Sequence, residues 1–150
     1  CGYLGEDRCD CSLDRVRRYR SKLSGPLLDR IDIHAEVPQL AMSRLRTAPA
    51  GESTAVVAER VAKAQAVQLA RNGCVNAQLA TSKLESVCAM EPALGRLLDS
   101  AADRLGLSAR ACHRVLKLAR TIADLDGCKA MTRDHLLEAL GYRALDRRLV

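Results

Sequence analysis

The chain has 150 residues, of which 48% are apolar and 28% charged, so it can form a packed core and is not disordered throughout. It contains neither Phe nor Trp, so the core must be aliphatic, which favours helices. The net charge is +6. No run approaches the roughly 18 apolar residues of a membrane span, and no secretory signal begins the chain. We therefore expect a cytoplasmic protein with no membrane partner.

The first predicted elements are a loop and two helices. Residues 1–11 are rich in Gly, Asp and Cys and are expected to form the loop. Ser12 can cap a helix over 13–23, which the Gly-Pro pair at 25–26 would end. The proline then suits the first turn of a very short helix in PLLDR, residues 26–30.

A single strand is predicted next. The segment IDIHAEV, residues 31–37, alternates apolar and polar side chains, which is typical of a strand buried on one face. A lone strand needs partners. We therefore interpret residues 1–51 as the end of a larger α/β domain, with 39–51 as a linker that contains Pro49 and Gly51.

The rest of the chain is predicted to be helical. Residues 52–73 form a linking helix that ends at Asn72-Gly73, and 74–150 form a compact helical bundle. The bundle is expected to contain a short helix with a capping box at Ser82 and Glu85, a helix from Pro92 to Gly106, one over 109–126 capped by Ser108, and one from Thr132 to Leu140. The expected fold class is therefore mainly α, with one strand in its N-terminal part.

The helix over 109–126 carries a candidate anion site. Arg110, Arg114 and Lys117 line up on the face opposite its apolar residues, which are Ala111, Cys112, Val115, Leu116, Ala119, Ile122 and Ala123. Arg110 lies in the first turn, where the helix dipole disfavours a cation by about 0.3–1 kcal/mol. A helix N-terminus with an arginine is a good site for a phosphate. The alternative is an arginine that points into solvent.

Arg30 lies between Asp29 and Asp32 at the start of the predicted strand. Either the carboxylates hold it in an intramolecular ion pair, or its charge serves a partner outside the chain.

The cysteines and histidines fall into two groups. Cys1, Cys9 and Cys11 are candidate zinc ligands with a fourth ligand upstream, or free loop thiols. The other cysteines are most simply core residues, and the histidines, which include His34 on the polar face of the strand, are more typical of surface or structural positions. The sequence contains no P-loop and no nucleophile motif, so we expect no chemistry from this chain alone.

Four blocks together carry a resemblance to a known family. They are CGYLGEDRCDCSLDRVRRYRSKLSGPLLDRIDIHAEVP, GES, LGLSARACHRVLKLARTIADL and HLLEALGYRALDRRL. The chain resembles the C-terminal part of the magnesium-chelatase-like AAA+ ATPases, in their ComM/YifB competence-protein branch. The resemblance implies an upstream core that carries Walker A, Walker B and most contacts to ATP and Mg²⁺. It also implies that residues 74–150 are the helical lid, and that Cys1 is the second of four cysteines that could bind Zn²⁺.

The resemblance also implies residue roles. Arg30 would be an arginine finger that reaches the ATP of the neighbouring subunit in a hexamer, and Arg110 would be the sensor-2 arginine of the lid. The implied function is a DNA motor, helicase-like or for branch migration, in natural transformation and recombination. The alternatives are a chelatase subunit that drives magnesium insertion into protoporphyrin, and a non-enzymatic helical interaction module. A run of basic residues could contact DNA or simply form a solvated helix face: Arg15, Arg17, Arg18 and Arg20.

Overall fold

The computed structural model describes residues 8–35, 37 and 40–143. Its elements in chain order are the helices α1 (Leu13–Arg20), α2 (Gly25–Leu28), α3 (Met42–Thr47) and α4 (Thr54–Asn72), the 3₁₀ turn η1 (Asn76–Gln78), and the helices α5 (Thr81–Val87), α6 (Pro92–Leu105), α7 (Ala109–Leu125) and α8 (Arg133–Gly141). The mainly α fold class is confirmed.

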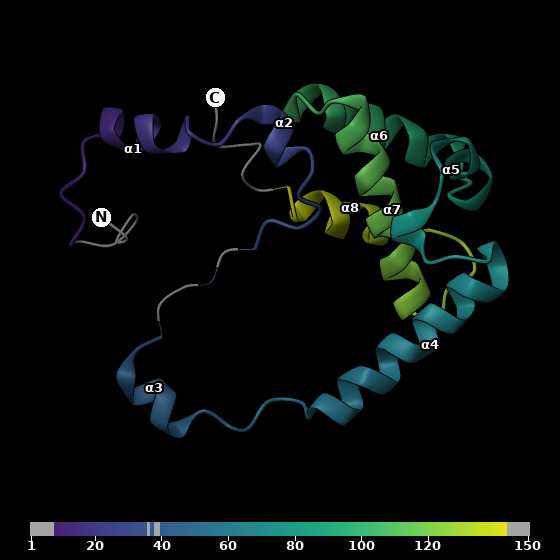
Figure 1. Ribbon diagram of the computed structural model, residues 1–150, viewed down its shortest axis with the longest axis horizontal. Coiled ribbons are helices and arrows are strands. Elements are labelled where there is room, and N and C mark those ends of the chain that lie inside the picture. The colour runs from purple at the N-terminus through teal and green to yellow at the C-terminus, as the bar shows by residue number, and fades with distance from the viewer. Residues whose placement is uncertain (1–7, 36, 38–39, 144–150) are drawn as a thin grey trace.

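Helix α7 is the centre of the molecule. It contacts α8, α4, η1 and α5, and α8 also contacts α6. Figure 1 shows α4 extending away from this cluster, while α1 and α3 lie apart from it. The apolar residues that α7 buries recur at helical spacing, as the sequence predicts: Ala111, Val115, Ala119, Ile122 and Ala123.

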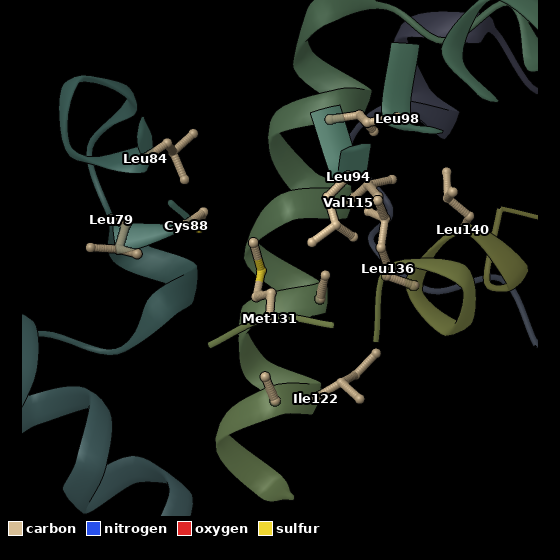
Figure 2. Packing of buried hydrophobic residues seen from close by; sticks show 13 residues of the cluster. Leu79, Leu84, Cys88, Leu94, Leu98, Val115, Ile122, Met131, Leu136 and Leu140 are labelled. Atoms are coloured by element: carbon tan, nitrogen blue, oxygen red, sulfur yellow. The ribbon is translucent and has the colours of Figure 1, made fainter. Parts of the chain in front are cut away.

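The core around α7 is aliphatic, as the composition predicts. Figure 2 shows Leu136 and Leu140 of α8 facing Val115 of α7, with Leu94 and Leu98 of α6 above them. Val115 and Leu136 are each 1% exposed. Burying a side chain of this size stabilises the fold by about 1.5–3 kcal/mol, so this cluster holds the bundle together.

Several predicted helix ends are confirmed. Ser108 caps α7, because its Oγ accepts a hydrogen bond from the N–H of Ala111 at 3.1 Å. Helix α4 ends at Gly73 and α6 at Gly106, both with positive φ. The capping box expected at Ser82 is wrong. Helix α5 begins at Thr81, so Ser82 lies within its first turn and cannot cap it.

The strand expected over 31–37 is not formed. No strand occurs among the described residues, where 31–35 are irregular and both Ile31 and Ile33 are exposed. Without a neighbouring strand, the backbone of this segment bonds to the helical bundle instead. The N–H of His34 donates to the carbonyl oxygen of Tyr142 at 2.8 Å, and His34 is buried rather than on a surface face.

Two other expectations for the N-terminal part need correction. Helix α1 ends at Arg20 rather than at residue 23. The linker expected over 39–51 contains the helix α3. Pro49 and Gly51 do not interrupt this helix, because both lie beyond its end. Across the described part of the chain, no helix combines the length and apolar character that crossing a membrane requires.

Candidate functional site

A groove runs along the N-terminal half of α7. Its volume is about 460 Å³, and the described residues that line it come from three parts of the chain. Asp32 and Ile33 belong to the segment after α2, Ala77 and Thr81 to the η1–α5 region, and the remaining lining residues to α7: Arg110, His113, Arg114, Lys117, Leu118 and Thr121. The row of cations predicted from helical spacing therefore forms one wall of a concave site.

The three cations of the groove differ in their partners. Arg114 forms an ion pair with Asp32. The ammonium group of Lys117 donates to the carbonyl oxygens of Leu79 at 2.7 Å and Ala77 at 3.1 Å. Arg110 is exposed in the first turn of α7, and none of the described residues accepts a hydrogen bond from its guanidinium. The groove thus contains an arginine that is available to an anion.

The two carboxylates beside Arg30 bond to other residues. Asp29 accepts a hydrogen bond from the Ser108 hydroxyl at 2.7 Å, and Asp32 pairs with Arg114. Arg30 itself is exposed, and no ion pair involves it within the described residues. The intramolecular pair left open by the sequence is therefore not formed there, which leaves the guanidinium available to a partner outside the chain.

Arg143 anchors the turn that carries Arg30. This side chain is 1% exposed, and its guanidinium donates to the carbonyl oxygens of Ile31 at 2.6 Å and Leu28 at 3.4 Å. It also lies 3.7 Å from Asp29. Because Leu28 is buried as well, the Arg30 turn and the groove belong to one packed unit. No local pattern predicts this contact, because it joins residues more than a hundred positions apart.

The basic run of the N-terminal part lies on α1. Arg15, Arg17 and Arg18 are exposed, and Arg17 is 3.9 Å from Asp14 in an exposed pair. Tyr19 is 74% exposed, with the Lys22 ammonium 5.6 Å from its ring centre. At about 100° per residue, Arg15 and Arg18 share one side of the helix, while Arg17 and Arg20 share another. The four arginines therefore surround the helix rather than form one stripe.

The proposed zinc ligands are only partly covered. Cys1 lies outside the described residues, whereas Cys9 and Cys11 are half-buried and form no disulfide. Within the described part, no three metal-ligating side chains gather. A structural zinc needs about four ligands, and two thiols do not supply them. The zinc site stays a prediction, and no chemistry is derived from it. Cys88, by contrast, is buried, and burial raises the pKa of its thiol, which fits the predicted core role.

A buried polar network lies at the C-terminal end of α7, and it was not predicted from the sequence. Asp124, whose carboxylate is fully buried, accepts from both terminal nitrogens of Arg71 at 2.6 and 2.8 Å. It also accepts from Asn76 at 2.8 Å and from Arg120 at 2.9 Å. The available signal was the i, i+4 spacing of two opposite charges, Arg120 and Asp124, outside the apolar face of the predicted helix.

The electrostatics of this network favour the ionised carboxylate. Burial raises the pKa of Asp124, but hydrogen bonds from Arg71 and Asn76 and the charge of Arg120 outweigh it, so the pKa lies below its ordinary value. The same bond to Asp124 raises the pKa of Arg71. The network joins α4 and η1 to α7, and its shared acceptor, the fully buried carboxylate of Asp124, has its oxygens bonded within the chain, so its role is structural.

Comparison with known proteins identifies the family. Residues 51–143 match the family described as magnesium chelatase, subunit ChlI C-terminal, and residues 1–45 match the one described as magnesium chelatase, subunit ChlI. The chain is 45% identical to the competence protein ComM of Haemophilus influenzae over 92% of its length. It is 42% identical to YifB of Escherichia coli and 40% identical to YifB of Salmonella typhimurium, in each case over 93% of its length.

These relatives are much longer proteins. The aligned region covers 27% of ComM and 28% of each YifB protein, so the chain spans little more than a quarter of their length. The matches extend across both the N-terminal segment with Arg30 and the helical bundle with Arg110. On this basis, the chain belongs to the magnesium-chelatase-like AAA+ family, in its ComM/YifB branch.

Proposed function

We propose that this chain is the part of a hexameric AAA+ ATPase that carries the arginine finger and the lid, and that the whole protein is a DNA motor in natural transformation. The observation that carries the proposal is the groove along α7, where Arg110 is exposed beside Arg114 and Lys117 and has no acceptor among the residues that the structure describes. ATP with Mg²⁺ would be held mainly by the core that precedes this chain in its longer relatives, and a cytoplasmic location fits both ATP and DNA.

Arg110 is assigned to the nucleotide of its own subunit. A guanidinium offers donors in a rigid fork that matches phosphate oxygens, and in the groove it adds to two further cations. When bound, a nucleotide polyphosphate would neutralise this concentration of positive charge. The lid would then close over the nucleotide as the phosphate draws Arg110 inward.

Arg30 is assigned to the nucleotide of the neighbouring subunit. A finger must project from its own subunit, remain free of internal carboxylates and stand on a fixed base. Arg30 is exposed, both neighbouring aspartates bond elsewhere, and Arg143 holds the backbone on either side of it. Fingers of this kind stabilise charge on the transferring phosphoryl group and raise rates by about 10³–10⁵.

The test uses the intact protein with its ATPase core. Arg30→Ala should abolish ATP turnover and leave nucleotide binding nearly unchanged, whereas Arg110→Ala should weaken binding, turnover or both. Arg104→Ala, at an exposed position near the end of α6, is the control and should do neither. Normal turnover by the Arg30 variant would exclude the finger assignment.

Action in trans has its own test. Arg30→Ala subunits are mixed with subunits that cannot bind ATP in their core. In mixed rings some sites would combine an intact core with an intact Arg30 from the next subunit, so turnover should reappear although neither variant is active alone. If mixing restores nothing while mixed rings form, Arg30 does not act across the interface.

Helix α1 is the proposed DNA contact, because Arg15, Arg17, Arg18 and Tyr19 are exposed and Arg20 is half-buried. Replacing Arg15 and Arg18 with Gln should weaken binding to all DNA sequences and reduce the slope of log affinity against log salt by about one for each lost phosphate contact. An unchanged slope would assign these residues to a solvated helix face.

A chelatase role is the second candidate, because both matched families are described by that activity. The two candidates differ in what stimulates ATP turnover by the intact protein. DNA should accelerate a motor, whereas protoporphyrin with its partner subunits should accelerate a chelatase. A protein that hydrolyses no ATP under either condition would instead be a helical interaction module.

A further inference from the structure

The groove already contains an anion from the chain itself. Among its described lining residues are three Lys or Arg side chains and a single carboxylate, that of Asp32, which pairs with Arg114. The two neighbouring cations do not pair with a carboxylate of the groove. Lys117 bonds to backbone carbonyls, and Arg110 has no acceptor among the described residues. Arg114 is therefore the groove cation whose charge an internal carboxylate neutralises.

This ion pair is exchangeable. The side chains of Arg114 and Asp32 are 31% and 51% exposed, so water and salt reach both groups. Exposed pairs of this kind are weak, unlike pairs enclosed in a core. A phosphate group offers the same oxygen geometry to a guanidinium as a carboxylate does, and it carries more negative charge.

We propose that Asp32 binds Arg114 in the place that a phosphate would take in the groove, and that a nucleotide polyphosphate displaces it. This inference rests on the proposed function, because it takes the groove as the phosphate site, but it adds a regulatory contact to that site. Arg110 receives the ligand first, since it has no acceptor to lose within the described part of the chain, and Arg114 joins once Asp32 leaves.

The displacement has a consequence next to Arg30. The turn before Asp32 stays attached, because Arg143 holds Leu28 and Ile31 and Ser108 holds Asp29. Asp32 is released, whereas His34 stays bonded to Tyr142 through its backbone N–H. Occupation of the groove in one subunit therefore changes the chain directly after the residue that serves the neighbouring subunit. This provides a physical route by which one nucleotide site reports to the next.

The test is an NMR titration of the 150-residue chain with sodium tripolyphosphate at constant ionic strength. Asp32→Asn removes the competing carboxylate and should tighten binding by about two- to five-fold, the range expected for losing a weak ion pair. Asp103→Asn makes the same charge change at an exposed position on α6 and should leave the affinity unchanged within about 1.5-fold. Asp32→Ser is a second variant that should behave like Asp32→Asn.

A double-mutant cycle separates displacement from a general charge effect. If Asp32 competes only by occupying Arg114, then Asp32→Asn should no longer tighten binding in an Arg114→Gln background. If it acts only through its charge in the groove, the gain should persist there. In the wild-type chain, tripolyphosphate should also shift the amide signal of His34, whose N–H bonds to Tyr142 just beyond the released residue.

The outcomes of the titration test the phosphate site in the groove and the displacement of Asp32 separately. Tripolyphosphate that perturbs no α7 amides in the wild type or in Asp32→Asn would overturn both the groove assignment and the displacement. Binding that Arg110→Ala abolishes, with equal affinities for wild type, Asp32→Asn and Asp103→Asn, would overturn the displacement alone. Tighter binding by Asp32→Asn that disappears with Arg114→Gln supports it.

Discussion

The two ends of α7 carry similar charges in opposite settings. At the C-terminal end, Asp124 and Arg120 have side chains that are 0% and 3% exposed and lie in a network closed by Arg71 and Asn76. At the N-terminal end, Arg114 and Asp32 form a single pair whose side chains are 31% and 51% exposed. The first arrangement fixes the position of α4 against the bundle, and the second leaves cations facing a groove.

Burial and complete hydrogen bonding, rather than charge alone, therefore distinguish a structural ion pair from a pair that can bind a ligand. Removing one member of a buried pair leaves an uncompensated charge, which is costly. Removing one member of an exposed pair leaves a charge that water can solvate, which costs little. The cations that can exchange partners at low cost are therefore those of the groove.

The largest expected effect is at the buried end. Asp124→Ala would leave Arg120 almost fully buried with fewer acceptors, and it should lower the free energy of unfolding by about 3–5 kcal/mol. Urea unfolding of the 150-residue chain, followed by circular dichroism, measures the loss. Asp103→Ala, on the exposed side of α6, is the control and should stay within about 0.5 kcal/mol of the wild type. Similar stability for the two variants would remove the structural assignment of the network.

A pH series tests the same carboxylate without removing it. The pKa of Asp124 in the folded chain lies below its ordinary value of 3.8, so its contribution to stability is fully present above that value. As the pH falls through the folded pKa, the contribution is lost. The unfolding free energy of the wild type should therefore decline more steeply than that of Asp124→Asn as the pH falls below about 4. Parallel curves would show that Asp124 is not held ionised.

Ser108, at the N-terminal end of α7, should have an intermediate effect. Its hydroxyl caps α7 and also donates to Asp29 beneath Arg30. Ser108→Ala should cost about 0.5–2 kcal/mol, the usual value of a lost N-cap, in urea unfolding. Ser108→Asn is the matched control, because its amide can accept from the helix N–H and donate to Asp29. An alanine variant as stable as the asparagine variant would exclude both roles.

The sequence predicted what periodicity and capping determine. The apolar face of α7, the cation row opposite it, and the ends of α4 and α6 follow from spacing, Ser108 and the two glycines. The prediction of a strand over 31–37 was wrong for the described residues, because an alternating pattern forms a strand only where a neighbouring strand can pair with it. Here the N–H of His34 bonds to Tyr142 instead. The Arg143 anchor and the Asp32–Arg114 pair depend on which distant segments meet, which local patterns do not encode.

The smallest effect on stability is expected at Arg114. Because the pair with Asp32 is exposed, Arg114→Gln should change the unfolding free energy by less than about 1 kcal/mol. The matched variant at the buried end is Arg71→Gln, which removes two hydrogen bonds to Asp124 and should cost several times more in the same assay. Arg114→Gln should nevertheless weaken tripolyphosphate binding by NMR titration, while Arg71→Gln, if it remains folded, should bind as the wild type does. A stability loss for Arg114→Gln as large as that for Arg71→Gln would mean that the pair of Arg114 and Asp32 is structural too. A cation that stabilises the fold so strongly through Asp32 would not exchange that carboxylate for a phosphate.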